Sequence, residues 1–255
     1  MFFNKSERIG VAKKIEEDVP TITPINSANE NPFILPPPAR VGLAWVERWD
    51  VILFHTQTTV LEILLGLLLG TVMGTVSALF LAYFATARRW LMPILVISQA
   101  IPVFALAPIL VLWLGYGLAS KVAMATLIIS FPVTAAFFDG LARTEPGQLD
   151  LARTMNASRW SILRNIRIPA ALPAFASGLR VATAVAPIGA VVGEWVGSSA
   201  GLGYLMLHSN GRMQIDVMFA ALFTLGTIAV ALYFTVDAFL SRVLFWQPDT
   251  QPSND

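Results

Sequence analysis

The chain of 255 residues contains no cysteine and only two histidines, His55 and His208. The missing cysteines exclude a disulfide framework and a thiolate metal site, and two histidines beside unrelated apolar stretches argue against a histidine-based metal centre. We therefore expect no metal and place both histidines at the surface. A glycine-rich loop ending in Lys-Ser or Lys-Thr is also missing, and no Ser–His or carboxylate–His arrangement indicates catalysis. The chain itself should be neither an ATP-binding protein nor an enzyme.

Charged residues are scarce as well, at 13% of the chain against about 25% in soluble domains. The net charge of +1 gives no indication of a nucleic-acid partner, whereas 56% of the residues are hydrophobic. Long apolar stretches occupy 63–85, 90–114, 122–138, 170–196 and 217–236. A helix needs about 20 residues to cross the hydrocarbon core, and in lipid the backbone must satisfy its own hydrogen bonds. The prediction is an all-α polytopic membrane helix bundle with five transmembrane helices.

The polar interruption at 140–173 is the most basic part of the chain, with five arginines opposed only by Glu145 and Asp150. Short basic loops face the cytoplasm. Placing this loop inside also puts Arg88, Arg89 and Arg242 inside, while the opposite short loops hold only Lys121 and Arg212. The chain should therefore cross the membrane several times and end in the cytoplasm.

Three regions follow from this pattern. Residues 1–50 are a polar, proline-rich tail that the alternation of spans places outside. The composition of the first forty predicts a disordered or extended chain, which ends in the stiff run of Pro36, Pro37 and Pro38. Residues 51–246 form the transmembrane domain, with a cytoplasmic loop at 140–170. Residues 247–255 form a short cytoplasmic tail.

Small and polar residues inside the spans supply the candidates for packing and for a pathway. Small residues four apart allow close helix contact, either within one subunit or between two. Gln99, Pro102 and Pro132 either line a pathway or shape a static bundle, and the glycines around Glu194 form either a gate or an interfacial loop. The acidic and basic residues at 62, 139, 180 and 237 should lie at membrane interfaces. The packing candidates are Gly66, Gly70 and Gly74; the pathway or gate candidates are Gln99, Pro102, Pro132, Glu194, Gly197, Gly201 and Gly203.

The loop at 140–170 has an internal order of its own. Apolar residues at helical spacing predict a first helix over 148–155 and a second one after Ser158, which can cap it. Asn156 tolerates the left-handed conformation that would turn the chain between them. Pro169 should stop the second helix. The alternative is a solvated amphipathic loop, but a loop about 30 residues long between spans should be either functional or structured by a partner.

This loop resembles that of the permease subunits of ATP-binding cassette importers. Their pattern is Glu-Ala-Ala, three residues, Gly, nine residues, Ile, one residue, Leu-Pro. Here Asp150-Leu151-Ala152 begins the pattern, Asn156 replaces the glycine, and Ile166-Arg167-Ile168-Pro169 ends it, with the spacing intact. The residues predicted for the ATPase-coupling loop are Asp150, Leu151, Ala152, Met155, Asn156, Ala157, Ser158, Arg159, Ile166, Ile168 and Pro169.

The resemblance covers roughly 31–247. The stretches 102–108, 112–121 and 193–204 look like the branch that imports nitrate, sulfonates, taurine and thiamine-precursor pyrimidines. The stretch 131–140 looks most like putative hydroxymethylpyrimidine permeases. Many members of this branch carry one more apolar span before the segment corresponding to 32–36, where this chain has a polar tail.

The resemblance implies a bacterial inner-membrane importer in which two permease copies form the solute pathway. Two ATPase subunits would bind ATP and Mg²⁺ beneath them, the loop would insert into each ATPase as a coupling helix, and an external protein would deliver solute. Two other classes remain open: a gradient-driven carrier or channel acting without an ATPase, and a membrane anchor. A carrier of that kind often shows internal repeats, and none is visible in this sequence.

Overall fold

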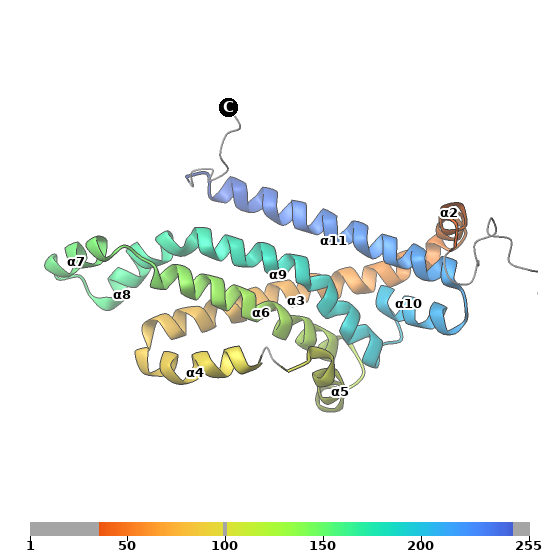
Figure 1. Cartoon of the computed structure of the whole chain (residues 1–255), viewed down its shortest axis with the longest axis horizontal. Helices are drawn as coiled ribbons and strands as arrows, with labels where there is room; N and C mark the ends of the chain where they lie inside the picture. Colours follow the sequence, from red (N-terminus) through yellow and green to blue (C-terminus); the bar gives the residue numbers. More distant parts are fainter. Residues whose placement is uncertain (1–35, 99–100, 247–255) are drawn as a thin grey trace, which may run out of the picture.

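The computed structural model describes residues 36–98 and 101–246, which contain helices and no strand. The predicted pathway residue Gln99 and the tails at 1–35 and 247–255 lie outside this described part. The helices are α2 (Pro38–Glu47), α3 (Trp49–Tyr83), α4 (Ala85–Ser98), α5 (Val103–Leu114), α6 (Leu118–Ala142), α7 (Pro146–Thr154), α8 (Arg159–Ile162), the π-helical segment η1 (Leu163–Arg167), α9 (Ile168–Gly197), α10 (Leu202–Gly211) and α11 (Ile215–Val243) (Figure 1).

Among the described residues, four helical segments are long and apolar enough to cross a membrane: α3, α6, the continuous segment Arg159–Gly197, and α11. The predicted span at 90–114 is divided instead between α4 and the short apolar helix α5. Pro102 stands at the N-cap of α5 with φ −58° and has no N–H to continue a helix from α4. The predicted all-α membrane bundle is confirmed, with its second span built from two shorter helices.

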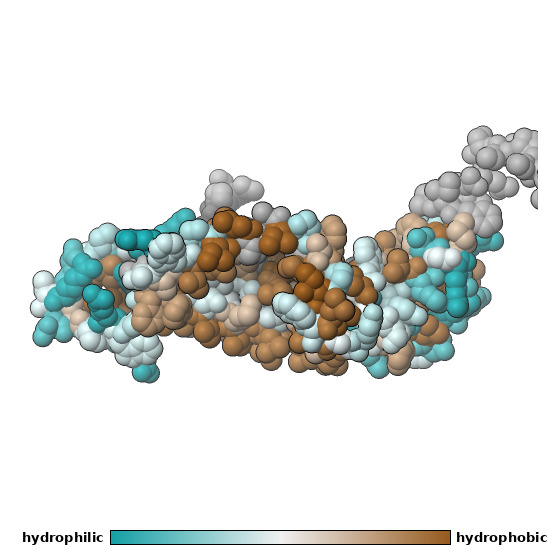
Figure 2. Space-filling view, turned by 90° about the horizontal axis from the view of Figure 1, so that it is seen from below, coloured by the Kyte–Doolittle hydropathy of each residue, from teal (hydrophilic) through white to brown (hydrophobic). Residues whose placement is uncertain are grey.

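The surface of the bundle is apolar between two polar ends, as Figure 2 shows for one face. Large hydrophobic side chains are widely exposed, among them Leu112 (82%), Trp113 (79%) and Phe234 (63%). In water such a contiguous apolar surface would favour aggregation, whereas lipid tails solvate it at no cost. The exposed belt therefore marks the membrane-facing surface.

Helix α6 lies between α3 and α9, and small residues bring these three helices into close contact. A Cβ atom added to Gly66 would lie 2.4 Å from the Cβ of Ala125, and one added to Gly70 would lie 2.6 Å from Ile129 Cγ2. A Cβ on Gly74 would lie 2.7 Å from the carbonyl oxygen of Ser130. These three glycines thus face α6 of the same chain.

One end of the bundle is closed by α2, the beginning of α3, α10 and the beginning of α11. Val41, Ile52, Leu205 and Val217 share a buried apolar cluster there. Our expectation of extended chain through residue 40 is wrong at its end, because α2 already begins at Pro38. A proline is well tolerated in the first turn of a helix, where its missing N–H would have had no partner.

The opposite end carries α7, α8 and the C-terminal end of α11 (Figure 1). A second buried cluster joins Leu81 at the end of α3, Leu141 at the end of α6, Leu163 of η1 and Ala171 of α9. The polar loop is thereby anchored on the ends of three long helices.

Candidate functional site

The loop between α6 and α9 turns sharply at Asn156. Its φ is +59°, the left-handed conformation that the sequence analysis allowed for this residue. The amide of Asn156 donates to the carbonyl of Arg153 at 2.9 Å, and the amide of Ala157 donates to that of Ala152 at 2.9 Å. This pair of bonds is the Schellman motif, which satisfies the last carbonyls of α7. Asparagine therefore fills the position at which the family pattern has glycine.

The second helix of the loop begins as predicted but does not stop where predicted. The Ser158 hydroxyl accepts a hydrogen bond from the amide of Ser161 at 3.2 Å and so caps α8. Our expectation that Pro169 ends this helix is wrong. The helix widens into η1, where the amide of Ile168 bonds to the carbonyl of Leu163, and then continues as α9 with Pro169 in its first turn. The wider π turn accommodates a proline that has no N–H to offer.

Two large apolar side chains project from the tip of the loop. Leu151 is 64% exposed and Met155 is 75% exposed. They border a groove of about 440 Å³ between α7 and the start of α9, which Ala152, Ile166 and Pro169 also line. Asp150 forms an exposed ion pair with Arg153 at 2.8 Å, beside the groove. Ile168 turns inward and packs against the cluster beneath the loop.

At the other end of the bundle, a buried carboxylate holds the start of α10. Glu194 of α9 is 1% exposed. Its Oε2 accepts hydrogen bonds from the amides of Gly203 at 2.5 Å and Tyr204 at 3.3 Å, and its Oε1 accepts one from the hydroxyl of Thr59 at 2.6 Å. A carboxylate in this position satisfies the free amides of a helix N-terminus and complements its dipole.

The glycines of this region make that close approach possible. Gly201 has φ +116°, and a Cβ atom on it would lie 2.2 Å from Glu194 Cδ. A Cβ on Gly203 would lie 2.8 Å from Glu194 Oε2. The structure thus brings together three of the predicted gate residues, Glu194, Gly201 and Gly203.

The other pathway candidates lie apart from this group. Pro102 is exposed at the start of α5. Pro132 lies in α6, where its carbonyl oxygen would be 2.9 Å from a Cβ on Gly178 of α9. Gly197 packs beside Val111 of α5.

Sequence reasoning missed a buried polar network that surrounds Glu194. Glu62 is fully buried and forms an ion pair with Lys121 at 2.7 Å, so our placement of Glu62 at an interface and of Lys121 in a loop is wrong. His55 is also buried, not at the surface: its Nδ1 accepts the amide hydrogen of Gly201 at 2.9 Å. His208 is exposed, as expected.

The spacing of polar and small residues along α3 could have revealed this network. Positions 55, 59 and 62 continue the helical stripe of Gly66, Gly70 and Gly74, and all of these residues are buried. A polar residue on the stripe that packs against α6 must therefore face the interior too. A comparable pair joins Arg180 of α9 to Asp237 of α11 at 2.6 Å, half-buried between two spans, where we had expected each residue separately at an interface.

The comparisons with known proteins agree with the fold. The chain is 58% identical to a probable ABC transporter permease protein of Haemophilus influenzae, over 84% of this chain and 87% of that protein. It is 35% identical to the formylaminopyrimidine transport permease protein ThiX of Halalkalibacterium halodurans, over 85% and 87% of the two chains. It is 40% identical to the riboflavin transport system permease protein RibX of Chloroflexus aurantiacus, over 83% and 80%.

More distant similarity supports the same assignment. Permeases for taurine and for aliphatic sulfonates match at 26% identity, which confirms the predicted branch. The fold matches that of a chain of the MetNI methionine ABC transporter with a TM-score of 0.68 at 20% identity, over 77% of this chain and 98% of that one. These relatives are transport permeases and not enzymes, and in ABC importers ATP hydrolysis resides in separate subunits.

Residues 66–244 match the family described as binding-protein-dependent transport system inner membrane component. That match covers α6, α9 and α11, the loop with its turn at Asn156, and Glu194 with its α10 partners Gly203 and Tyr204. The chain is therefore a multi-pass inner-membrane permease of the ATP-binding cassette importers and belongs to this family.

Proposed function

We propose that two copies of this chain form the solute pathway of an importer and that the loop transmits movement from two ATPase subunits, which bind ATP and Mg²⁺. The observation that carries the proposal is the tip of the loop. Two exposed apolar side chains, Leu151 and Met155, stand on a turn that a Schellman motif holds in place, beside a groove of about 440 Å³. An apolar, pre-ordered helix end of this kind fits a cleft on a partner, because little entropy is lost when it docks.

The proposed orientation puts the loop and the C-terminus in the cytoplasm. The loop and the C-terminal end of α11 lie at the same end of the bundle, and Arg88, Arg159 and Arg242 also belong to elements that reach this end (Figure 1). The positive-inside rule assigns such an end to the cytoplasm. The end with α2 and α10 then faces outward, where an external solute-binding protein would deliver its cargo.

The coupling role is tested by co-purification of the ATPase and by uptake in reconstituted vesicles. Leu151→Asp or Met155→Asp should abolish both the co-purification of the ATPase and the uptake of solute. The new carboxylate would be buried without a partner in an apolar cleft of the ATPase. Leu207→Asp is the matched control: it makes the same kind of change at a 49% exposed leucine of α10 at the opposite end. ATPase retention by the loop variants would contradict the coupling role. Solute flux through the chain without any ATPase would support a gradient-driven carrier instead.

For the solute we propose a small nitrogen heterocycle such as a thiamine-precursor pyrimidine. The 35% identity to a formylaminopyrimidine permease supports it, together with the motif at 131–140. The 40% identity to a riboflavin permease favours a flavin as a second candidate. Competition of unlabelled formylaminopyrimidine, hydroxymethylpyrimidine and riboflavin for uptake by the complex with its binding protein separates the two. Inhibition by riboflavin alone would replace the pyrimidine by the flavin.

A further inference from the structure

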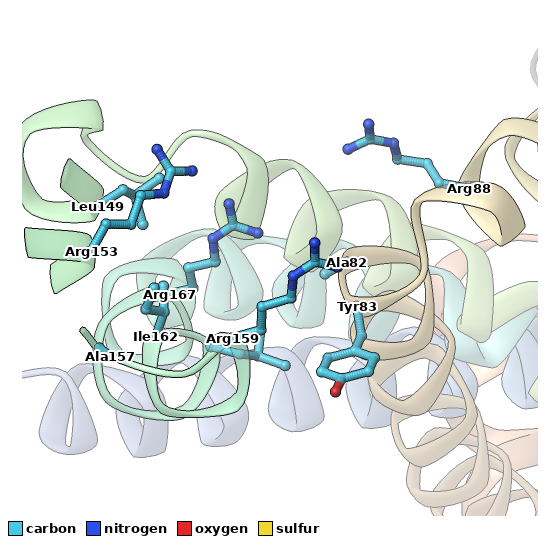
Figure 3. A pocket seen from close by; sticks show the side chains of 10 residues that line it. Ala82, Tyr83, Arg88, Leu149, Arg153, Ala157, Arg159, Ile162 and Arg167 are labelled. Atoms are coloured by element: carbon cyan, nitrogen blue, oxygen red, sulfur yellow. The ribbon is translucent and has the colours of Figure 1, made fainter.

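A second hollow of the loop lies on the other side of α7 from the groove. Its volume is about 480 Å³, and it lies between the end of α3, the beginning of α4, α7 and the α8–η1 segment. Four arginines line it: Arg88 of α4, Arg153 of α7, Arg159 of α8 and Arg167 of η1. Figure 3 shows Arg153, Arg159 and Arg167 extending from the loop, with Arg88 reaching toward them from α4. We call this hollow the arginine pocket.

The arginine pocket has positive charge without matching negative charge. In the described part of the chain, no acidic residue lines the pocket, and of its four arginines only Arg153 has a carboxylate partner, the exposed Asp150. Within the described residues, no carboxylate lies within ion-pair distance of Arg88, Arg159 or Arg167. The Nε of Arg167 is buried there and has no hydrogen-bond partner. A buried guanidinium donor beside three further cations calls for an anion that can accept several hydrogen bonds.

The position of the pocket in the membrane identifies the anion. Ala82 and Tyr83, which form part of its wall, are the last residues of the long span α3. The ring of Tyr83 packs edge-on against Trp160 of the loop at 6.4 Å, and Trp90 in α4 is 70% exposed. Tyrosine and tryptophan gather at the membrane–water interface, where the lipid headgroups lie. The aromatic residues beside the pocket are therefore those expected at the level of the lipid phosphates.

We propose that the arginine pocket binds the headgroup phosphate of an anionic phospholipid. Basic pockets between membrane helices bind such headgroups, and a phosphate offers oxygen acceptors that suit several guanidinium groups. The bound phosphate bridges Arg88 of α4 and the arginines of the loop. The groove beside Leu151 and Met155 stays free on the other side of α7. This site goes beyond the importer function and does not depend on which solute is carried.

The proposal is tested with the purified full chain in lipid nanodiscs. In phosphatidylcholine discs titrated with phosphatidylglycerol, we expect preferential retention of phosphatidylglycerol on extraction, measured by native mass spectrometry. Arg88→Gln and Arg159→Gln are suitable variants because both residues are exposed and come from different elements. Each should weaken phosphatidylglycerol binding about fivefold, since one basic residue at an anionic surface contributes about that factor. Arg164→Gln is the matched control, an exposed arginine of η1 that does not line the pocket.

Three results would overturn the proposal. Equal phosphatidylglycerol retention by the pocket variants and by Arg164→Gln would show that the pocket does not select the lipid. Displacement of the lipid by millimolar inorganic phosphate would identify a free-anion site. Loss of the ATPase partner with unchanged lipid retention would assign Arg88 and Arg159 to a protein contact. Circular dichroism of each variant verifies that the helices are intact, so a fold defect is recognised separately.

Discussion

The buried pair of Glu62 and Lys121 allows a test in which the two partners should respond unequally. Lys121 Nζ lies 2.7 Å from Glu62 Oε1, and the side chains are 7% and 0% exposed. The other carboxylate oxygen, Glu62 Oε2, is buried without a hydrogen-bond partner in the described part of the chain. Lys121→Met keeps most of the alkyl chain but leaves the Glu62 carboxylate buried without its cation. Glu62→Gln removes the negative charge but keeps an oxygen that can accept the hydrogen bond from Lys121.

The expected magnitudes follow from this asymmetry. Breaking a buried ion pair by removing one partner costs about 3–5 kcal/mol, and we expect Lys121→Met to reach that range. Glu62→Gln should cost about 1–3 kcal/mol, because an amide of the same shape remains and its oxygen still accepts a hydrogen bond from Lys121. The double variant Glu62→Leu/Lys121→Met should lie within about 1 kcal/mol of the wild type, since well-packed apolar residues replace such pairs at little cost.

The measurement is the free energy of unfolding in mixed micelles, obtained by titration with sodium dodecyl sulfate and read by far-ultraviolet circular dichroism. The control is Arg153→Met, which breaks an ion pair whose side chains are 65% and 69% exposed and should change stability by less than about 1 kcal/mol. Equal costs for Lys121→Met and Glu62→Gln, or a double variant no more stable than Lys121→Met alone, would refute the reasoning.

Three further predictions concern backbone geometry. Gly201→Ala should destabilise the protein by about 2–5 kcal/mol in the same titration, because φ is +116° and the added Cβ would meet Glu194 at 2.2 Å; Gly226→Ala, with nothing within 4 Å, should be neutral or slightly stabilising. Asn156→Gly should raise stability by less than about 1 kcal/mol and leave ATPase retention unchanged, because glycine adopts φ +59° without strain; a loss of retention would show that the amide side chain is needed. Ser158→Ala should cost about 1 kcal/mol of loop stability, seen as faster amide hydrogen exchange at the start of α8, and unchanged exchange would contradict the capping role.

Local features of the fold were predictable because each depends on a few neighbouring residues. Hydrophobic length indicated the spans, the left-handed tolerance of asparagine indicated the turn at Asn156, and a serine before a helical pattern indicated the cap at Ser158. Pro169 misled us because a proline that ends an α-helix can be accommodated after a π turn, and nothing in the one-dimensional pattern distinguishes the two.

The buried network could not be predicted in the same way, since it depends on contacts between residues far apart in the chain. Glu194 meets Thr59 across 135 positions, and Lys121 meets Glu62 across 59. Charge alone suggested an interface for Glu62, because an isolated carboxylate in lipid is costly. The helical spacing that Glu62 shares with Gly66 would have indicated that Glu62 is buried. It would not have indicated that Lys121 is its ion-pair partner.

The helix does not end at Pro169, so one continuous helical segment connects the loop to the opposite end of the bundle. Arg159–Gly197 is a single helical segment of 39 residues, about 58 Å long at 1.5 Å per residue. Its first turns line the two hollows of the loop, and Glu194 near its last turn holds the start of α10. If this segment tilts as one body by about 5° around its loop end, Glu194 moves by roughly 5 Å. That displacement exceeds the length of the hydrogen bonds by which Glu194 holds α10, so a tilt of this segment relative to α10 would break them.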